Sequence, residues 1–274
     1  MSDRPMQSLV RTSEEILGRT LDGLALGVQV RHIATTPLGF CSADSSVRAV
    51  LEAAEWKIFS QIPVRDGDHT CGVLERAGCK LEATVRSAMK PLDDSILVAA
   101  GAPLTGFLEM AANGPYRLVV DGGKVNGIVT RSDLQKLPVR IVVFTFVTNL
   151  ELLMAEVIRS QKLDPAGWKQ YLSDGRQKKV KEKFDQLANA DFYVDELTCT
   201  EFCDKRTILK HALKNLPKGF NNDFEQIEKL RNTVCHAGEY AQNQQELKDF
   251  VDRFQRARRW IDDLQKWLRE HNNG

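Results

Sequence analysis

Arg231, Asn232 and His236 stand close together in the second half of the chain, and side chains of these types could cleave RNA. Histidine can move a proton near neutral pH, and arginine is a permanent planar cation that can bind phosphoryl oxygens. Those groups are required when the 2′-hydroxyl of RNA attacks the adjacent phosphate, and Asn232 could orient that hydroxyl or the backbone. Helix positions five apart differ by about 140° around the axis, so one copy does not aim both side chains at one phosphate. This chemistry therefore requires two copies of the motif facing each other.

A structural role for the same side chains stays open. Arg231 and His236 could be surface or interdomain residues. A histidine near a helix C-terminus is also favoured there by the helix dipole, with no catalytic role. The motif therefore leaves a catalyst and a binding surface as alternatives.

A second pair of residues with chemistry is Thr130 and Asp133, which follow an apolar segment in the first half. A strand that ends at such a pair places a hydroxyl beside a helix N-terminus. Thr130 can then donate to a phosphate, and Asp133 can accept from both hydroxyls of a ribose. The alternative is that Asp133 is a helix N-cap and nothing more.

These two residues belong to the second copy of an internal repeat. Gly72-Val73-Leu74 overlays Gly127-Ile128-Val129 at an offset of 55 residues, so each copy is a whole supersecondary unit. Each copy predicts the order strand, helix, strand, strand, with extended segments at 37–43 and 91–99 and hairpin turns at Asp66-Gly67 and Asp121-Gly122-Gly123. The same offset matches Val64 with Val119, Asp66 with Asp121, Gly67 with Gly122, and Val30-Arg31 with Val85-Arg86.

The repeat resembles a tandem pair of cystathionine-beta-synthase (CBS) domains, a module that senses adenine nucleotides. The resemblance covers about residues 28–138. It is carried by Tyr116-Arg117-Leu118-Val119-Val120-Asp121 and the segment from Gly127 to Leu134, and in the first copy by Ile62-Pro63-Val64 and Gly72-Val73-Leu74.

The CBS resemblance implies a regulatory ligand, AMP, ADP or ATP, bound between the repeats. Thr130 and Asp133 would hold phosphate and ribose, Arg117 would meet phosphate, and Thr36 would lie on the adenine side. The first copy departs from the pattern, because Glu75 stands where Thr130 does and Gly78 where Asp133 does. One working site is therefore expected.

From residue 139 onward, apolar residues at a spacing of three to four predict an all-helical bundle. Its candidate helices are a long first one, three at about 166–189, 200–214 and 220–237, and a C-terminal one. With the Arg231-Asn232-x-x-x-His236 string, this half resembles the HEPN superfamily over about residues 139–270.

The HEPN resemblance implies a metal-independent endoribonuclease that acts as a dimer on an RNA substrate. Joined to a CBS pair, it would be a nucleotide-controlled effector, such as a stress or defence toxin, with an antitoxin or regulatory protein as a further partner. The competing function is a non-catalytic, nucleotide-sensing module that binds RNA or protein.

Composition agrees with a two-domain globular protein. The 274 residues are 42 % hydrophobic and 27 % charged, and residues 1–140 hold 16 basic and 16 acidic side chains, so a generally basic nucleic-acid coat is excluded. We expect an α+β fold with a capping segment at 1–27, the CBS pair at 28–138 and the helical domain at 139–274.

The cellular setting follows from what the sequence contains. The apolar stretch Val139–Ile158 includes Arg140, Asn149, Glu151 and Glu156, which favours a buried helix over a membrane span. The N-terminus has no basic and apolar leader pattern, so a cytoplasmic location is expected. The six cysteines have no paired spacing typical of metal sites, so no metal is expected.

Overall fold

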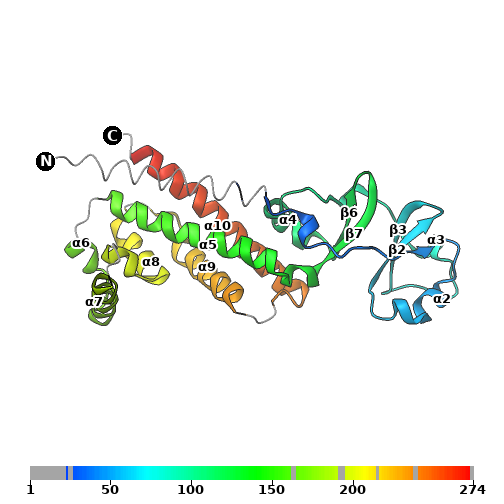
Figure 1. The fold of residues 1–274 in the computed structure, drawn as a ribbon, viewed down its shortest axis with the longest axis horizontal. Helices are drawn as coiled ribbons and strands as arrows, with labels where there is room; N and C mark the ends of the chain where they lie inside the picture. The colour runs from blue at the N-terminus through cyan, green and yellow to red at the C-terminus, as the bar shows by residue number, and fades with distance from the viewer. Residues whose placement is uncertain are drawn as a thin grey trace. The chain divides into compact units, whose positions relative to one another are not determined.

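The computed structural model describes residues 23, 27–161, 165–190, 195–213, 216–236 and 240–271. The chain divides into two compact units, one of Ala25–Val139 and one of Arg140–Gly274 together with Met1–Leu24. Within the described residues, every strand lies in the first unit and the second unit is helical, which confirms the α+β fold (Figure 1). Apart from Gly23 and Gly27, the expected capping segment 1–27 lies outside the described residues.

The first unit contains one hairpin in each repeat. In the first copy β2 (Gln61–Asp66) pairs with β3 (His69–Glu75), and in the second β6 (Tyr116–Asp121) pairs with β7 (Lys124–Thr130). Corresponding bounds differ by 55 residues at every end, and both hairpins contain an irregularity at the same place. A parallel strand flanks each hairpin: β1 (Cys41–Ser42) beside β2, and β5 (Leu97–Ala99) beside β6.

The two repeats exchange strand residues. β4 (Lys90–Pro91), at the start of the second repeat, pairs antiparallel with β3 of the first, with Lys90 opposite Val73. In return, Thr35 pairs antiparallel with Ile128 of β7 through N–H···O bonds of 2.8 and 3.2 Å. Each repeat therefore completes the sheet of the other.

This exchange corrects the prediction of one extended segment at 91–99. Lys90–Pro91 and Leu97–Ala99 are separate strands in different sheets, joined through the short helix η3 (Asp94–Ile96). The prediction was wrong because one run of residues serves two sheets, and Asp93, which caps η3 by accepting from the Ser95 amide at 2.6 Å, marks the division. The first copy's segment is likewise shorter than predicted, with a strand at Cys41–Ser42 alone.

The first unit also contains several short helices. Ser46 caps α2 by accepting a hydrogen bond from the Ala49 amide, and Thr84 caps α3 in the same way through Ser87. Ile62, Val64 and Leu74 are fully buried in the core of the first repeat. The helices are η1 (Val30–His32), α2 (Val47–Glu52), η2 (Ala54–Trp56), α3 (Val85–Ala88), α4 (Leu104–Met110), η4 (Ala111–Asn113) and η5 (Arg131–Gln135).

The helical unit is built around two long helices, α5 (Leu137–Ser160) and α10 (Gln244–His271), which lie side by side and contact through Phe146 and Phe254 (Figure 1). The segment predicted as one helix at 166–189 is two, because Ser173 has extended backbone and starts a new helix. The remaining elements are α6 (Pro165–Lys169), α7 (Asp174–Asn189), η6 (Glu196–Cys199), α8 (Phe202–Ala212) and α9 (Phe220–Cys235).

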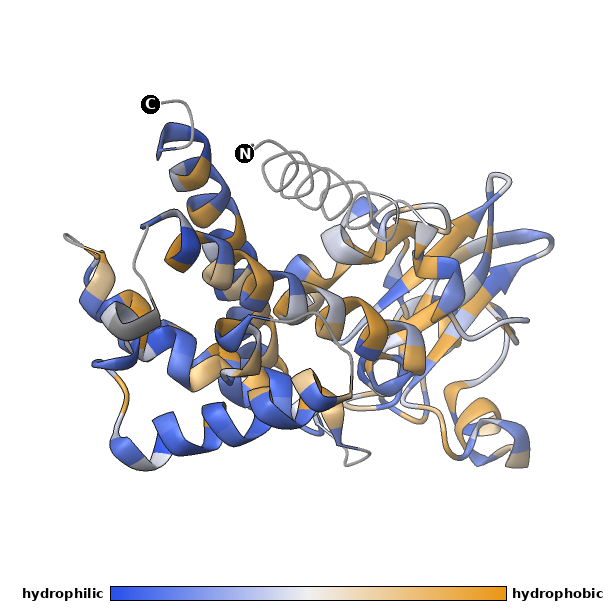
Figure 2. Cartoon of the chain, turned by 60° about the vertical axis from the view of Figure 1, so that its left-hand side comes forward, coloured by the Kyte–Doolittle hydropathy of each residue, from blue (hydrophilic) through white to orange (hydrophobic). Residues whose placement is uncertain are grey.

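Apolar residues line the packed faces of the helices (Figure 2). By length and composition α5 could cross a membrane, and 61 % of its most apolar window is buried. Its buried face includes Leu150, Met154 and Ile158, as expected for the central helix of a bundle. Ile141 and Phe144 on the same helix stay 44 % and 46 % exposed.

Candidate functional site

Asp133 is the centre of a hydrogen-bonded cluster in the first unit. Its side chain is 5 % exposed, and its Oδ2 accepts from the amide (2.7 Å) and the hydroxyl (3.0 Å) of Thr130. Its Oδ1 accepts from Thr35 Oγ1 at 2.9 Å and faces Lys136 Nζ at 2.7 Å. Both oxygens of the carboxylate are therefore engaged within the protein.

The local fold explains how Thr130 and Asp133 meet. Thr130 ends β7 and is the N-cap of η5, while Asp133 is the third residue of that helix and reaches back to the Thr130 amide. This reciprocal arrangement is a capping box. Asp133 thus acts in capping from inside the helix, and Thr130, not Asp133, is the N-cap residue.

Thr35, rather than Thr36, contacts the aspartate. The strand exchange places Thr35 opposite Ile128, two residues before Thr130, and its hydroxyl then reaches Asp133. Thr36 lies against Gly127, where an added Cβ would be 2.8 Å from its methyl group. The CBS resemblance had singled out Thr36, on the adenine side, and not its neighbour Thr35.

Arg117 is a buried cation at the start of β6. The residue as a whole is 9 % exposed, and its Nη1 donates to the Tyr116 carbonyl at 2.8 Å. Among the described residues it has no ion pair with a carboxylate, and burial lowers the pKa of its guanidinium. A Cβ at Gly114 would lie 2.7 Å from Nη1, so glycine leaves room there for the arginine.

A small hollow opens beside Arg117. Its lining includes Thr130 and Arg131, which follow one another at the end of β7, and also Gly114 and Phe107. The hollow therefore brings together two of the predicted residues, Arg117 and Thr130. Arg131 and Gly114 also line the hollow and were not predicted as site residues.

The corresponding place in the first repeat is occupied differently. The pairing of Gln61 with Glu75 matches that of Tyr116 with Thr130, so Glu75 is the structural counterpart of Thr130. The Glu75 carboxylate forms an ion pair with Lys90, at 2.8 Å between Oε1 and Nζ. Gly78, the counterpart of Asp133, has φ of +83° and supplies no acceptor side chain.

The helical motif lies at the end of α9. Arg231 is half-buried on this helix, and Asn232 and His236 are exposed. The helix ends at Cys235, and His236 is its C-cap with extended backbone (φ −99°, ψ 148°). The angular argument for two facing copies is therefore wrong, since it assumed that both side chains project from one helix.

Arg140 fixes the backbone at this helix end. Its Nη1 donates to the carbonyl of His236 and, at 3.4 Å, to that of Val234. Its guanidinium also stacks 4.9 Å from the ring centroid of Tyr240, whose pKa burial raises to about 12. Arg140 was read from the sequence as a charge that argued against a membrane span, and its capping role depends on the bundle.

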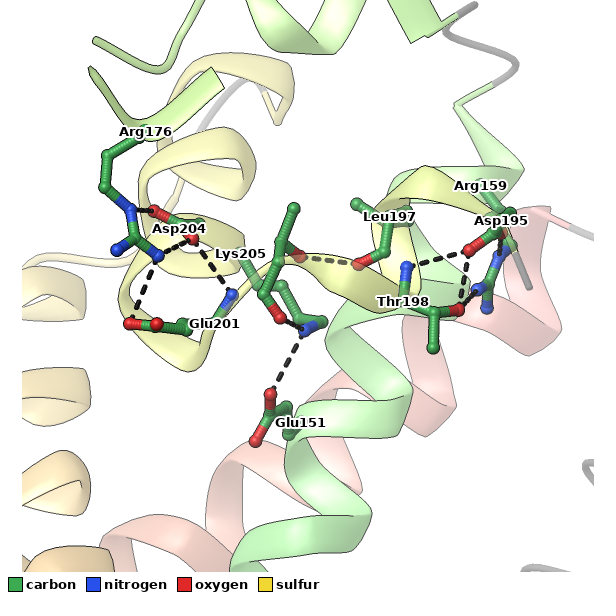
Figure 3. A network of polar contacts seen from close by, with 10 residues as sticks. Glu151, Arg159, Arg176, Asp195, Leu197, Thr198, Glu201, Asp204 and Lys205 are labelled. Carbon is green, nitrogen blue, oxygen red and sulfur yellow. Dashed lines mark hydrogen bonds and ion pairs between the residues drawn. The ribbon is translucent and has the colours of Figure 1, made fainter. Parts of the chain in front are cut away.

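A network of buried charges elsewhere in the helical unit is internally matched (Figure 3). Lys205 donates to the Thr200 carbonyl at 2.6 Å and to Glu151 at 3.1 Å, and Asp204 accepts from Arg176 at 2.5 and 2.9 Å. These bonds join α8 to α5 and α7, which is a structural role. Within the described ranges, no group of three or more His, Cys, Asp or Glu residues could hold a metal ion.

Comparison with known proteins finds no matching family model and no matching curated protein. Among solved structures, the chain is similar to the CBS domain of a bacterial CNNM/CorC family Mg2+ transporter in complex with ATP. That match has 22 % identity and a TM-score of 0.35, and it covers 44 % of this chain and 94 % of that one.

Two further CBS structures are similar. A CBS domain-containing protein of unknown function from Bacillus anthracis has 21 % identity and a TM-score of 0.36, covering 41 % of this chain and 94 % of that one. The CBS domain of a membrane protein from Sphaerobacter thermophilus has 21 % identity and a TM-score of 0.36, covering 46 % and 97 %. None of the three is described as a HEPN protein.

Proposed function

We propose that the first unit binds one adenine nucleotide per chain and so acts as a CBS-type sensor. The observation that carries this proposal is Arg117, a buried guanidinium with no carboxylate partner in the described part of the chain. Burying an uncompensated charge costs several kcal/mol, and a bound phosphate would remove that cost. Arg131, which lines the same hollow, offers further donors for that phosphate, whereas the amide and hydroxyl of Thr130 already donate to Asp133.

The ribose is assigned to Asp133. Carboxylates accept readily from vicinal hydroxyls, and Thr130 connects the phosphate side of the site to this carboxylate through its 3.0 Å hydrogen bond. In the first repeat, Ile62 stands at the counterpart of Arg117, and Glu75 is already paired with Lys90. That copy lacks both the cation and the ribose acceptor, which supports a single site.

Titration calorimetry with AMP, ADP, ATP and adenosine tests the sensor. We expect one site per chain and weaker binding of adenosine, since it lacks the phosphate. Arg117→Met should bring AMP down to the affinity of adenosine. Arg86→Met removes an exposed arginine that is paired with Asp44 and Asp66. It is the matched control and should change neither the affinity for AMP nor the affinity for adenosine. Two equivalent sites, or no binding of any adenine nucleotide, would refute the proposal.

The finer proposal concerns the helical unit, which we propose is a metal-independent endoribonuclease that works as a homodimer. His236 would move the proton of the attacking 2′-hydroxyl or of the leaving group, and Arg231 would neutralise charge on the phosphorane. Supporting this role, the side chains of Arg231, Asn232 and His236 make no hydrogen bond to another described residue, and Arg140 holds the His236 backbone. The homodimer rests on the HEPN resemblance.

Nucleotide occupancy of the first unit would control the second, as a sensor linked to an effector. The alternative is that the helical unit binds RNA or a partner protein without cleaving it. A half-buried Arg231 and an exposed His236 fit that function as well. Incubating the protein with an RNA pool, with and without AMP or ATP, distinguishes them: unchanged RNA that nevertheless co-migrates with the protein would favour the binding module.

A further inference from the structure

Lys136 faces Oδ1 of Asp133, the carboxylate to which the ribose is assigned above. Its Nζ lies 2.7 Å from Asp133 Oδ1, 2.5 Å from the Ile33 carbonyl and 3.5 Å from Thr35 Oγ1. The lysine side chain is 39 % exposed, whereas that of Asp133 is 5 % exposed. The ammonium group thus covers a buried carboxylate while remaining in contact with solvent.

The carboxylate has no free capacity in this arrangement. An ionised aspartate offers about four lone-pair positions, and four donor groups already use them: two from Thr130, one from Thr35 and one from Lys136. A ribose would bring two more hydroxyl donors. It can bind Asp133 after at least one of the present donors has left.

The donors differ in how easily they can leave. The bond from the Thr130 amide belongs to the capping box that starts η5, and the Thr130 hydroxyl donates to the same carboxylate oxygen. Thr35 is held in place because both its backbone N–H and its carbonyl are hydrogen-bonded to Ile128. Lys136 reaches Asp133 through four methylene groups, and its ammonium can move into solvent by side-chain rotation alone.

We propose that Lys136 is a displaceable guard of the nucleotide site and sets its selectivity for the ribose diol. This inference rests on the proposed sensor function. When the site is empty, the ammonium neutralises Asp133. A ligand with both the 2′- and 3′-hydroxyl compensates Asp133 in its place, whereas a ligand without them leaves the lysine where it is.

Displacement has a structural consequence. Lys136 directly precedes Leu137, the first residue of α5, and its contact with the Ile33 carbonyl ties that point of the chain to the segment before Thr35. Occupation by a ribonucleotide releases this tie. Ligands that lack the diol do not release it, so the guard makes the response depend on the sugar.

The test compares AMP with 2′,3′-dideoxy-AMP by calorimetry on the full chain. In the parent protein, the affinity for AMP divided by that for 2′,3′-dideoxy-AMP is lower than it would be without Lys136, because the diol must compete with the lysine. Lys136→Met and Lys136→Gln should each raise this ratio by about 10-fold, the equivalent of one charged hydrogen bond. Lys136→Arg, which keeps a cation, is the control and should leave the ratio near that of the parent.

The possible outcomes distinguish a failure of the guard from a failure of the sensor. An unchanged ratio in the folded Met and Gln variants overturns the guard and leaves the sensor intact. An equal rise in the Arg variant also overturns it, since a retained cation should still compete. If the parent binds neither ligand, the sensor itself fails and the guard with it. Thermal unfolding of each variant confirms that the comparison is made on folded protein.

Discussion

Thr35 Oγ1 donates to Asp133 Oδ1 at 2.9 Å although the two residues are 98 positions apart in the sequence. The bond exists because the first repeat lends Thr35 to the sheet of the second, next to Ile128. The candidate site is therefore a product of both repeats. A change at either end of this bond should affect nucleotide binding and the folding of the first unit together.

Asp133→Asn tests this coupling. The amide keeps the shape but loses charge and acceptor capacity, so nucleotide affinity should fall by about 1.5–3 kcal/mol, the scale of hydrogen bonds to a charged group. The melting temperature of the first unit should also fall, because the amide has one acceptor oxygen in place of two, so either Thr130 or the pair Thr35 and Lys136 loses its acceptor. Asp121→Asn, at an exposed aspartate facing Arg31, should change neither quantity. Normal binding by Asp133→Asn would remove the aspartate from the site.

Gly72 and Gly127 mark the two crossings of the exchanged strands, and alanine at each should have unequal effects. A Cβ at Gly72 would lie 2.2 Å from the Lys90 carbonyl oxygen, whereas at Gly127 the nearest atom is the Thr36 methyl at 2.8 Å. Backbone moves less easily than a side chain. Denaturant unfolding should show Gly72→Ala destabilised by about 2–3 kcal/mol and Gly127→Ala by about 1 kcal/mol.

The control for this pair is Gly106→Ala on α4, where nothing lies within 4 Å of the added Cβ. Helix propensity predicts a small gain there, about 0.5–1 kcal/mol. The strand exchange would be contradicted if Gly72→Ala were as stable as the parent. A larger loss at Gly127 than at Gly72 would contradict the order of the two effects.

The acid stability of the helical unit should depend on Asp223. This carboxylate, 8 % exposed, accepts from Trp260 Nε1 at 3.0 Å and Arg259 at 2.5 Å, and it also pairs with Arg256. Burial would raise its pKa, but the bonds from Trp260 and Arg256 outweigh burial and hold the pKa below the ordinary 3.8. Stability from this group is therefore present above about pH 4 and lost as pH falls through the lower folded pKa.

Asp223→Asn should flatten that acid limb and lower the free energy of unfolding at pH 7 by about 3 kcal/mol. Asp252→Asn removes an exposed partner of the same Arg256 and should cost under about 0.5 kcal/mol. Chemical denaturation from pH 7 to pH 2 measures both. Parallel pH profiles for Asp223→Asn and the parent would show that another group controls the acid limb.

RNA cleavage should survive EDTA and leave a 2′,3′-cyclic phosphate or 3′-phosphate with a 5′-hydroxyl. His236→Ala should slow it by roughly 10²–10⁴-fold if the imidazole moves a proton. Arg231→Ala should lose a comparable amount with little change in RNA affinity, because one cation contributes little to ground-state binding. His69→Ala, in the first unit, is the control. Full activity in both the Arg231→Ala and the His236→Ala variant would refute the ribonuclease proposal.

The ribonuclease proposal also predicts a homodimer, because the resemblance places the active site across two chains. Sedimentation at micromolar concentration should give twice the mass of 30.9 kDa. Mixing His236→Ala with Arg231→Ala protein should restore part of the activity if the groups act across the dimer. If the protein is a stable monomer and still cleaves RNA with full activity per chain, this prediction is contradicted.

The internal repeat could be predicted from the sequence because both copies need the same residue types at the same turns and close contacts. Both hairpins need the same turn residues, and Arg31 with Asp121 and Arg86 with Asp66 form equivalent ion pairs, which explains why those positions matched. The glycines at 72 and 127 align because a strand crosses close to each. The chemistry of a turn or a close approach is visible in sequence.

The exchange itself could not be predicted, because pairing between distant strands leaves no periodic signal. Thr35 was missed for that reason, since it reaches Asp133 through the exchanged strand. Arg131 and Lys136 lie next to the predicted pair in sequence, and they were missed because the resemblance assigns no role to their positions. The break at Ser173 was missed because the apolar spacing continues on both sides of it. Arg231 and His236 were found as a pair, but the end of α9 between them was not.

The reciprocal strands also bear on what one repeat could do by itself. A single repeat made alone would have one strand segment to give and one unpaired hairpin edge, because β3 pairs with Lys90–Pro91 and β7 with Thr35 of the other repeat. Two separate copies could satisfy each other by the same exchange, so an isolated repeat is expected to pair with a second copy of itself. Within the one chain the two copies need not be alike: Glu75 is tied to Lys90 in one, whereas Asp133 accepts from Thr35 in the other.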